Sequence, residues 1–271
     1  MRRAATVERA LRRLSQRVFL QWWELYGYVA PRVSLPVLER VTVIIPGYSV
    51  ERARFVETSV RALLRCDFVE RVIVSNHNPT TRIRAWVRLT DPRLTLIDHP
   101  VRHGPGWRWL VASNFDPEYL ICIDDDVLVM PHQVAALFRT LLADPAVPHG
   151  RAGAIGNQYY QYPTPGDGAM EVDDLYIVYA VTRAHLKRYG DLVAAVTATG
   201  HVSSDEIEYL ADYLLISRAG HAMPKIHNVG RLMQLPTFDK PGVAVHKEPA
   251  FEATRLRVRR TLERLTKACE I

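Results

Sequence analysis

Three consecutive carboxylates are the residues whose types and spacing most directly suggest chemistry. Asp124, Asp125 and Asp126 follow the apolar run Leu120–Ile123 and precede a second apolar run that ends at Met130. Adjacent carboxylates repel one another, but a divalent cation that prefers hard oxygen ligands, such as Mg²⁺ or Mn²⁺, reverses that balance. Alternate side chains of a strand share a face, so Asp124 and Asp126 can point to one ion while Asp125 points away. The triplet therefore predicts a metal or sugar-nucleotide site, with a solvated acidic turn as the simpler alternative.

A second acidic pair, Asp205 and Glu206, stands at the start of a segment with helical periodicity, Ser203–Ser217. Serine caps and first-turn carboxylates are typical of a helix N-terminus, because both interact with its unpaired N–H groups. A role as helix-dipole partners alone is therefore the structural alternative for this pair. Near the end of the chain stand His246 and Arg255, for which a surface histidine and a solvated basic helix are the structural interpretations.

Short apolar strands alternate with helical segments in the first half of the chain, and they must position the acidic triplet. This alternation predicts right-handed parallel βαβ units in a doubly wound sheet, whose ligands bind beyond the carboxyl ends of the strands. Pro46, Tyr48 and Asn76 follow two of these strands, as the aspartates follow another. The predicted strands are Val41–Ile45, Val69–Ser75, Leu94–Ile97 and Leu120–Ile123. The predicted helices include one capped by Ser49 that runs to Arg65, Ile83–Leu89 and Val134–Leu142.

Composition places the chain among globular proteins. Hydrophobic residues make up 48% and charged residues 24% of its 271 residues, which is enough for one large α/β domain or two small ones. The formal net charge of +6 favours anionic partners such as nucleotide phosphates, nucleic acid or anionic lipid. Three scattered cysteines form no CxxC pair, so no zinc ribbon or disulfide framework is indicated. This cysteine usage, without a signal-peptide core or a run of about 20 apolar residues, predicts a cytoplasmic protein.

Residues 1–30 differ in character from the rest of the chain. Arginines alternate with apolar residues at helical spacing and lead into a cluster of aromatic and aliphatic residues. A segment of this type can lie on an anionic membrane, which would make the protein peripheral on the inner membrane surface. A helix packed on the domain, or on the second subunit of a homodimer, is the alternative. The arginines are Arg2, Arg3, Arg9, Arg12, Arg13 and Arg17, and the cluster is Phe19, Leu20, Trp22, Trp23, Leu25, Tyr26 and Tyr28.

Five segments taken together resemble a known group of enzymes. In chain order they read VTVIIPGY, RVIVSNHN, ICIDDDVLV, SSDEIEYL and VHKEPAFEATR, and the resemblance covers about residues 41 to 265. The chain resembles the GT-A nucleotide-sugar glycosyltransferases, and within them most closely the exostosin-like family, which transfers N-acetylhexosamines with retention. The resemblance implies an α/β, Rossmann-like GT-A fold with a mainly parallel central sheet and helices on both faces. It assigns residues 41–271 to the glycosyltransferase domain and leaves residues 1–40 as a basic and aromatic helical extension.

The resemblance also implies roles for individual residues. The implied ligands of manganese or magnesium, which would hold the donor diphosphate, are Asp124, Asp126 and His246. The residues implied to bind the donor are Pro46, Tyr48, Asn76, Arg108, Asp124, Asp125 and Arg255. Asp205 and Glu206 match the acidic pair beside the transferred sugar and the acceptor, and they are the implied catalytic residues. The family has two aspartates there, so the longer Glu206 departs from its pattern.

The predicted function is transfer of a sugar, hexosyl or N-acetylhexosaminyl, from a nucleotide-sugar donor to an acceptor hydroxyl. A UDP-sugar is favoured as the donor, and retention as the outcome. Three acceptor classes stay open, namely a glycan, a lipid-linked glycan and a modified nucleic acid. A phosphatase-type hydrolase is one alternative, although its acids usually follow the first strand and a Thr or Val stands where this chain has Leu128. A non-catalytic module that binds nucleic acid or membrane is the other.

Overall fold

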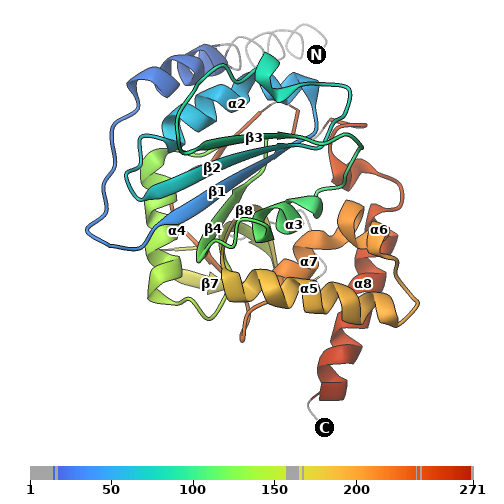
Figure 1. The fold of residues 1–271 in the computed structure, drawn as a ribbon. Helices are drawn as coiled ribbons and strands as arrows, with labels where there is room; N and C mark the ends of the chain where they lie inside the picture. Colours follow the sequence, from blue (N-terminus) through green and yellow to red (C-terminus); the bar gives the residue numbers. More distant parts are fainter. Residues whose placement is uncertain are drawn as a thin grey trace, which may run out of the picture.

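A sheet of eight strands forms the centre of the part of the chain that the structure describes (Figure 1). This computed structural model describes residues 15, 18–156, 165–166, 168–235, 237–238 and 240–269. The strand order is β3-β2-β1-β4-β8-β6-β9-β7. The first four strands in the chain are β1 (Val41–Gly47), β2 (Val69–Asn76), β3 (Leu94–Asp98) and β4 (Tyr119–Ile123). The other four are β6 (His149–Ala154), β7 (Ala169–Glu171), β8 (Asp174–Thr182) and β9 (Lys225–His227).

The first half of the sheet is parallel, as the alternation of strands and helices predicted. β1 pairs in parallel with β2 and with β4, and β2 pairs in parallel with β3. Residues Val41 to Pro46 of β1 are all buried, because the strand lies between two neighbours and under helices. Strands covered on both faces take continuous apolar runs, and this is why the run from Val41 to Ile45 was readable in the sequence.

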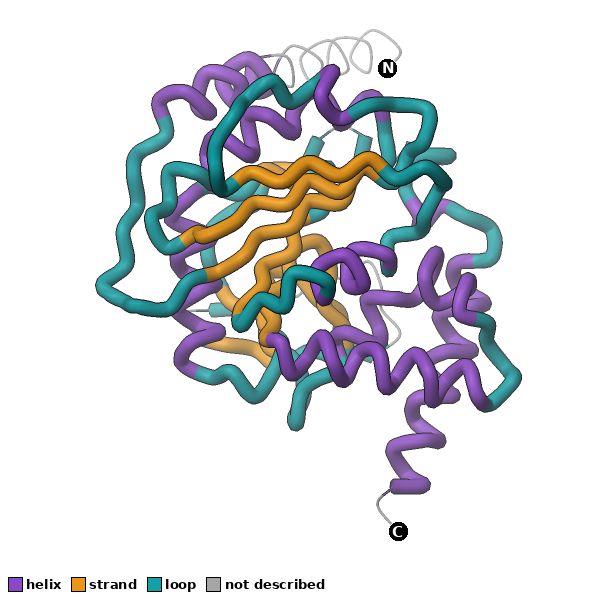
Figure 2. The backbone as a smooth tube through the Cα atoms, viewed as in Figure 1, coloured by secondary structure: helices purple, strands orange, loops and turns teal. Residues whose placement is uncertain are grey.

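Helices cover both faces of the sheet (Figure 2). α2 (Val50–Leu63) packs with α4 (Pro131–Ala143) on one face. α3 (Trp107–Ser113) packs with α5 (Arg183–Ala198) on the other, and α5 was not anticipated from the sequence. Ser49 caps α2 as predicted, since its hydroxyl accepts a hydrogen bond from the N–H of Glu51 at 3.2 Å.

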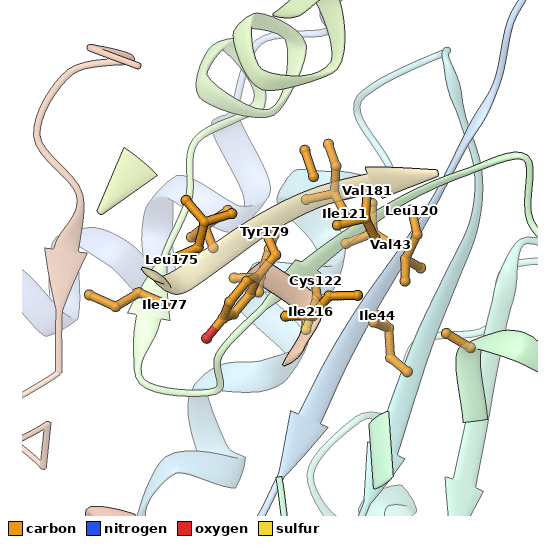
Figure 3. Packing of buried hydrophobic residues seen from close by; sticks show 14 of the residues in the cluster. Val43, Ile44, Leu120, Ile121, Cys122, Leu175, Ile177, Tyr179, Val181 and Ile216 are labelled. Atoms are coloured by element: carbon orange, nitrogen blue, oxygen red, sulfur yellow. The ribbon is translucent and has the colours of Figure 1, made fainter. Parts of the chain in front are cut away.

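The sheet is mixed beyond β4, because β8 runs antiparallel between β4 and β6. Every residue of β8 is buried, and its apolar side chains complete the core that β1 and β4 begin. Figure 3 shows Val43, Ile121 and Val181 from these three strands together with Ile216. A fully buried side chain of this size contributes roughly 1.5–3 kcal/mol relative to an exposed one, so this layer is a major source of stability.

Two predicted helices differ in the structure. The stretch Ile83–Leu89 holds only a single 3₁₀ turn, Ile83–Ala85, whose first N–H donates to the Asp98 carboxylate at 2.9 Å. The helix predicted over Ser203–Ser217 is broken into three parts, namely α6 (Ser204–Glu206), a π-helical turn η2 (Ile207–Ala211) and α7 (Asp212–Ser217). A π-helical turn inserts a residue into a helix and rotates the side chains that follow, which periodicity alone does not reveal.

A separate small core joins the N-terminal helix, residues 18–29, to the rest of the protein. Trp23 is fully buried there against Phe55 of α2, Leu128 of β5 (Val127–Leu128) and Leu235. β5 pairs antiparallel with β10 (Met233–Gln234) to form a two-stranded sheet. Residues 1–14, 16 and 17 of the predicted Arg-rich segment lie outside the described residues. The last helix is α8 (Phe251–Cys269), whose C-terminal end extends away from the body in Figure 1.

Cys66 and Cys122 are fully buried free thiols. Burial raises the pKa of each thiol to about 12. Cys122 lies in β4 between β1 and β8, whereas the sulfur of Cys66 lies 3.8 Å from the carbonyl oxygen of Pro131 at the start of α4. The two thiols therefore mark two different regions of the core.

Candidate functional site

A cavity of about 110 Å³ lies beyond the carboxyl ends of β1 and β4, where ligands of α/β sheets bind. Charged residues from four segments of the chain line it, namely Arg52, Arg108, Asp124, Asp125, Asp126 and Asp212. Aromatic and apolar residues from β8 and from the segment around α8 complete the walls, among them Tyr176, Ile177, Tyr179, Phe238, Val245 and Phe251. A cavity with mostly apolar walls and a few convergent charges is typical of a small-ligand site.

Arg108, in the first turn of α3, joins two carboxylates of the cavity. The Oδ2 atom of Asp212 accepts hydrogen bonds from Arg108 Nε at 3.1 Å, from Arg108 Nη2 at 2.8 Å and from Trp109 Nε1 at 2.8 Å. Arg108 also forms an ion pair with Asp124 through Nη1. The side chains of Arg108 and Asp212 are each only 4% exposed. Burial alone would lower the pKa of Arg108, but the charges of Asp212 and Asp124 raise it well above its ordinary value.

Arg52, in the first turn of α2, pairs with the other two members of the acidic triplet. Its Nη1 lies 2.7 Å from Asp125 Oδ1, and its Nη2 lies 2.9 Å from Asp126 Oδ2. The same guanidinium donates to the hydroxyl and the carbonyl oxygen of Thr237 at 3.1 and 3.0 Å. Asp125 also accepts from the backbone N–H of Tyr48 at 3.0 Å. Arg52 thus holds α2, the triplet and the segment before α8 together.

The triplet is a turn rather than an extended strand, which corrects the orientation expected from the sequence. The N–H of Val127 donates to the carbonyl oxygen of Asp124 at 3.1 Å and closes the turn. Asp125 and Asp126 consequently share Arg52, whereas Asp124 faces Arg108. The alternation of side chains along a strand therefore does not apply to these residues.

The cavity lining carries more acid than base. Four carboxylates, those of residues 124, 125, 126 and 212, face two guanidinium groups, so the lining has two negative charges in excess when all four carboxylates are ionised. Burial raises the pKa of both Asp124 and Asp126, although Arg108 and Arg52 respectively oppose the rise. This deficit of positive charge suits a divalent cation, and its assignment to Asp124 and Asp126 stays a prediction. Among the described residues, no group of three or more His, Cys, Asp or Glu side chains is arranged to hold a metal ion by itself. Magnesium sites in enzymes commonly use one or two carboxylates together with substrate phosphates.

The π-helical turn η2 and a glycine loop position Asp212. The N–H of Gly106 donates to the carbonyl oxygen of Glu208 at 2.8 Å, and the N–H of Gly104 donates to the Glu208 carboxylate at 2.7 Å. A Cβ atom at Gly104 would lie 2.7 Å from the Glu208 carbonyl oxygen, and one at Gly106 would lie 2.9 Å from the Cβ of Asp212. Only glycine allows this approach, which brings the loop before Arg108 against the turn before Asp212.

Most of the predicted donor and metal residues come together at this cavity. Those that line it are Pro46, Tyr48, Arg108, Asp124, Asp125, Asp126 and His246. The ring of His246 lies 5.6 Å, between centroids, from that of Phe238 in the cavity wall. Their roles in donor and metal binding stay predictions.

Four other predicted residues lie elsewhere than on the cavity wall. The Asn76 amide donates to Asp98 at 2.7 Å and is buried at the carboxyl end of β2. Arg255 is fully buried in α8, where it pairs with Glu252 at 2.7 Å. Glu206 closes a capping box, since its carboxylate accepts from the N–H of Ser203 at 3.0 Å, and it pairs with Arg257.

Asp205 is exposed in the first turn of α6 and, like Glu206, does not line the cavity. The capping geometry is the one that the helix-dipole interpretation anticipated for this pair. The carboxylate that this part of the chain does present to the cavity is that of Asp212, which sequence reasoning missed. One signal could have found it, because Asp212 is a lone acid inside the apolar run from Leu210 to Ile216. A charge within a buried run needs a partner and is therefore a candidate site residue.

A larger cleft of about 860 Å³ adjoins the cavity and shares Tyr48, Pro105 and Leu210 with it. Its polar lining comes from the loops after β1, β2 and β3 and from η2, and includes Asn78, Thr80, Arg102, His103 and Tyr209. The ring of His103 stacks on Trp107 with centroids 3.8 Å apart. Flat rings and amide groups at strand ends are suited to a planar, hydrogen-bonding ligand.

His77 stiffens the wall between the two spaces. Its Nδ1 lies 3.1 Å from the Tyr48 hydroxyl, and its Nε2 lies 2.9 Å from the hydroxyl of Ser75. Burial lowers the pKa of His77 to about 3, so the ring is neutral at physiological pH. The ring acts as part of a fixed hydrogen-bonded network that holds Tyr48 in place.

Comparisons with known proteins identify the fold. No protein-family profile matches the chain, and no curated protein matches its sequence. Among solved structures, the chain is similar to GalNAc-T7 solved with UDP, GalNAc and Mn²⁺, with a TM-score of 0.58 and 8% identity over 83% of this chain. The match covers 48% of the GalNAc-T7 chain, so the present chain spans about half of that length.

Two further structures align less closely. A mannosyltransferase from Pyrobaculum calidifontis, solved with GDP-Man and Mn²⁺, aligns with a TM-score of 0.48 and 16% identity over 99% of this chain and 76% of its own. S. aureus TarS residues 1–349 align with a TM-score of 0.45 and 14% identity over 69% of this chain and 58% of their own. The likeness to GalNAc-T7 confirms the predicted fold class, an α/β fold of the GT-A type, and does not single out the exostosin-like family.

Proposed function

We propose that the protein is a metal-dependent glycosyltransferase that moves a sugar from a nucleotide-sugar donor to an acceptor hydroxyl. The observation that carries this proposal is the acidic triplet at the carboxyl end of β4, held by two buried arginines beside a small cavity and a larger cleft. The excess of carboxylates over guanidinium groups in the cavity lining supports cation binding, and the GT-A fold supports a nucleotide-sugar donor.

The two spaces suit the two ends of such a donor. The larger cleft, with Tyr48, Asn78 and His103 in its lining, would take the nucleoside, for which we favour uridine. The diphosphate would then lie between the spaces, next to Asp124 and Asp126. A divalent cation bound there would stabilise the negative charge of the departing diphosphate. Arg108 and Arg52 would keep the acidic side chains oriented toward it.

Asp212 is the carboxylate that we propose for the sugar end of the site. It lines the cavity, and the three hydrogen bonds to its Oδ2 fix its position before any substrate arrives. A prepositioned negative charge stabilises positive charge that develops on the sugar in the transition state. This role differs from the one predicted for Asp205 and Glu206, and the two assignments are separable by mutation. Retention of the anomeric configuration remains part of the proposal, with the anomer of the product, read by NMR, as its test.

A thermal-shift experiment with UDP, GDP and inorganic phosphate, each with and without Mn²⁺, tests the function. At a ligand concentration of about 100 times Kd, binding adds roughly 2.7 kcal/mol of stability, or about 5–10 °C for a chain of this size. We expect this shift for a nucleoside diphosphate only when Mn²⁺ is present. We expect it to vanish in Asp124→Asn and to persist in Asp67→Asn, whose exposed carboxylate lies at the opposite end of the sheet.

The same screen separates the competing functions. A shift with phosphate and metal but with neither nucleotide would favour a phosphatase-type hydrolase. No shift with any of these ligands, while the protein remains folded, would contradict the glycosyltransferase proposal and favour a binding module. A chelator that leaves the UDP response unchanged would exclude the assignment of Asp124 and Asp126 to a cation.

A further inference from the structure

The N-terminal helix, residues 18–29, has two opposite apolar faces. One face carries Trp23 and packs into the small core on α2 and β5. The other consists of Val18, Trp22, Leu25 and Val29, spaced four, three and four residues apart, which places them in one stripe along the helix. Their exposed fractions are 57%, 41%, 60% and 65%. We call this stripe the outer face.

The outer face is unusual for a helix on the surface of a globular protein. Such a helix normally turns polar residues to the solvent and apolar residues to the core. Here the exposed apolar side chains are contiguous, Tyr28 extends them with 59% exposure, and Glu24 is the single acidic residue among positions 18–29. Contiguous apolar surface of this kind marks a contact surface, whereas scattered exposed apolar residues do not.

Positive charge surrounds the outer face. The Arg61 guanidinium, which pairs with Glu57 at 2.6 Å, lies 4.6 Å from the centroid of the Tyr28 ring, and Arg65 donates to the carbonyl oxygen of Tyr28 at 2.7 Å. Arg32 is exposed just after the helix. The sequence that precedes the helix, residues 1–17, contains six arginines and one glutamate. The outer face therefore combines tryptophan, tyrosine and aliphatic residues with a strongly cationic border.

We infer that the outer face docks on an anionic lipid bilayer. Tryptophan and tyrosine favour the boundary between headgroups and acyl chains, and each basic residue near an anionic membrane contributes about 1 kcal/mol. A second copy of the chain is the less suitable occupant. The stripe is only about 16 Å long at 1.5 Å per residue, too short for a stable coiled coil, and dimerisation would bring two cationic borders together.

The helix is anchored to the elements that hold the acidic triplet. Phe55, one turn after Arg52 in α2, contacts the inner face of the helix, as does Leu128, two residues after Asp126. The bilayer surface would therefore be fixed relative to the cavity by two short, rigid connections. Removal of the whole helix would uncover this small core, so substitutions on the outer face are the better test.

The test compares the wild-type protein with the double variant Leu25→Glu/Val29→Glu in vesicle co-sedimentation. We use phosphatidylglycerol–phosphatidylcholine vesicles, with pure phosphatidylcholine vesicles as the uncharged probe. The wild-type protein should bind the anionic vesicles, bind the neutral ones at least tenfold more weakly, and lose affinity in high salt. The double variant should bind the anionic vesicles at least tenfold more weakly. Ile155→Glu, which alters a side chain of 51% exposure at the end of β6, should bind like wild type.

Trp22 gives a second readout that does not depend on the variant folding. Trp22 is one of five tryptophans, so the part of the emission that shifts to the blue on addition of anionic vesicles, and that brominated lipid quenches, should be absent in Trp22→Phe. Wild-type protein that stays in the supernatant with anionic vesicles would overturn the inference, as would a correctly folded double variant that binds as well as wild type. If the wild-type protein is a dimer, the double variant is a monomer and neither binds vesicles, the outer face contacts a second copy of the chain instead of a membrane. These outcomes do not depend on nucleotide binding and so leave the proposed function separately testable.

Discussion

Replacement of Asp212 by asparagine is the most informative single change, because it removes one charge and almost no volume. An asparagine oxygen placed where Asp212 Oδ2 lies can still accept the three hydrogen bonds from Arg108 and Trp109, whose lengths are 3.1, 2.8 and 2.8 Å. A hydrogen bond to an ionised acceptor contributes roughly 1.5–3 kcal/mol to stability, and one to a neutral acceptor about 1 kcal/mol. Each of the three hydrogen bonds should therefore contribute about 1 kcal/mol less in the variant. We therefore expect Asp212→Asn to lower the free energy of unfolding by about 3 kcal/mol.

This loss leaves a folded protein to study. Domains typically have 5–15 kcal/mol of stability, and a loss of about 3 kcal/mol lowers Tm by roughly 6–12 °C in a chain of this size. Urea unfolding followed by circular dichroism measures the change. The matched control is Asp205→Asn, which neutralises an exposed carboxylate at a helix start and should cost less than about 1 kcal/mol. A loss below about 1 kcal/mol for Asp212→Asn would refute the reasoning, since it would mean that Asp124 alone suffices to hold Arg108.

The same pair of variants separates the two catalytic assignments. If the Asp212 charge stabilises the transition state, Asp212→Asn should lower sugar transfer about a hundredfold or more at temperatures well below its Tm, while UDP and Mn²⁺ bind nearly as before. Asp205→Asn should then transfer sugar at close to the wild-type rate. The opposite ranking would return the catalytic role to the acidic pair at the start of α6.

Two further predictions concern stability. Gly104→Ala should destabilise the protein by about 1–3 kcal/mol, because the new Cβ would meet the Glu208 backbone at 2.7 Å. The control Gly190→Ala, in an exposed part of α5 with no atom within 4 Å of the new Cβ, should stabilise the protein by about 0.5–1 kcal/mol. Equal effects of the two variants in urea titrations would argue against the close approach at Gly104. His185→Gln should make the free energy of unfolding less dependent on pH in the acid range. Burial lowers the pKa of His185 to about 4, so the unfolded state, with a pKa near 6.5, binds more protons below that pH, and stability falls as pH drops from about 6.5 towards 4. The free energy of unfolding of the wild-type protein should therefore fall by about 2 kcal/mol more than that of the variant between pH 7.5 and pH 5. Glutamine can keep the 3.1 Å hydrogen bond from the Thr182 N–H. Parallel pH profiles of the two proteins would contradict the role of His185.

The sequence was sufficient for the parallel half of the sheet and for much of the cavity. Buried parallel strands are continuous apolar runs, and β1 and β4 are followed directly by the polar residues that line the site. Tyr48 and Asp124 could thus be placed at the site from the sequence, whereas Arg108, in α3, was named only through the family resemblance. The reason is local, because a strand end fixes the position of the next few residues whatever the distant packing.

Other features depend on contacts between distant segments and could not be read in this way. The π-helical turn before Asp212 is held by the loop at Gly104 and Gly106, about a hundred residues earlier in the chain. Arg52 was missed because its partners, Asp125 and Thr237, lie in other elements of the chain. An arginine in an amphipathic helix looks like a solvated residue until its partners are known.

The two buried thiols give the molecule built-in probes of its own fluctuations. A thiol with a pKa near 12 and no exposed surface reacts with an alkylating reagent only when the structure around it opens transiently. In a Cys269→Ser background, the alkylation rate of Cys122 would report openings of the sheet beside Arg108. The alkylation rate of Cys66 would report separation of the start of α4 from the turn before β2. A ligand that bridges the cavity should slow the reaction of Cys122 more than that of Cys66. Mass spectrometry of the two labelled peptides could therefore map which part of the fold a donor or a membrane stabilises, without any engineered label.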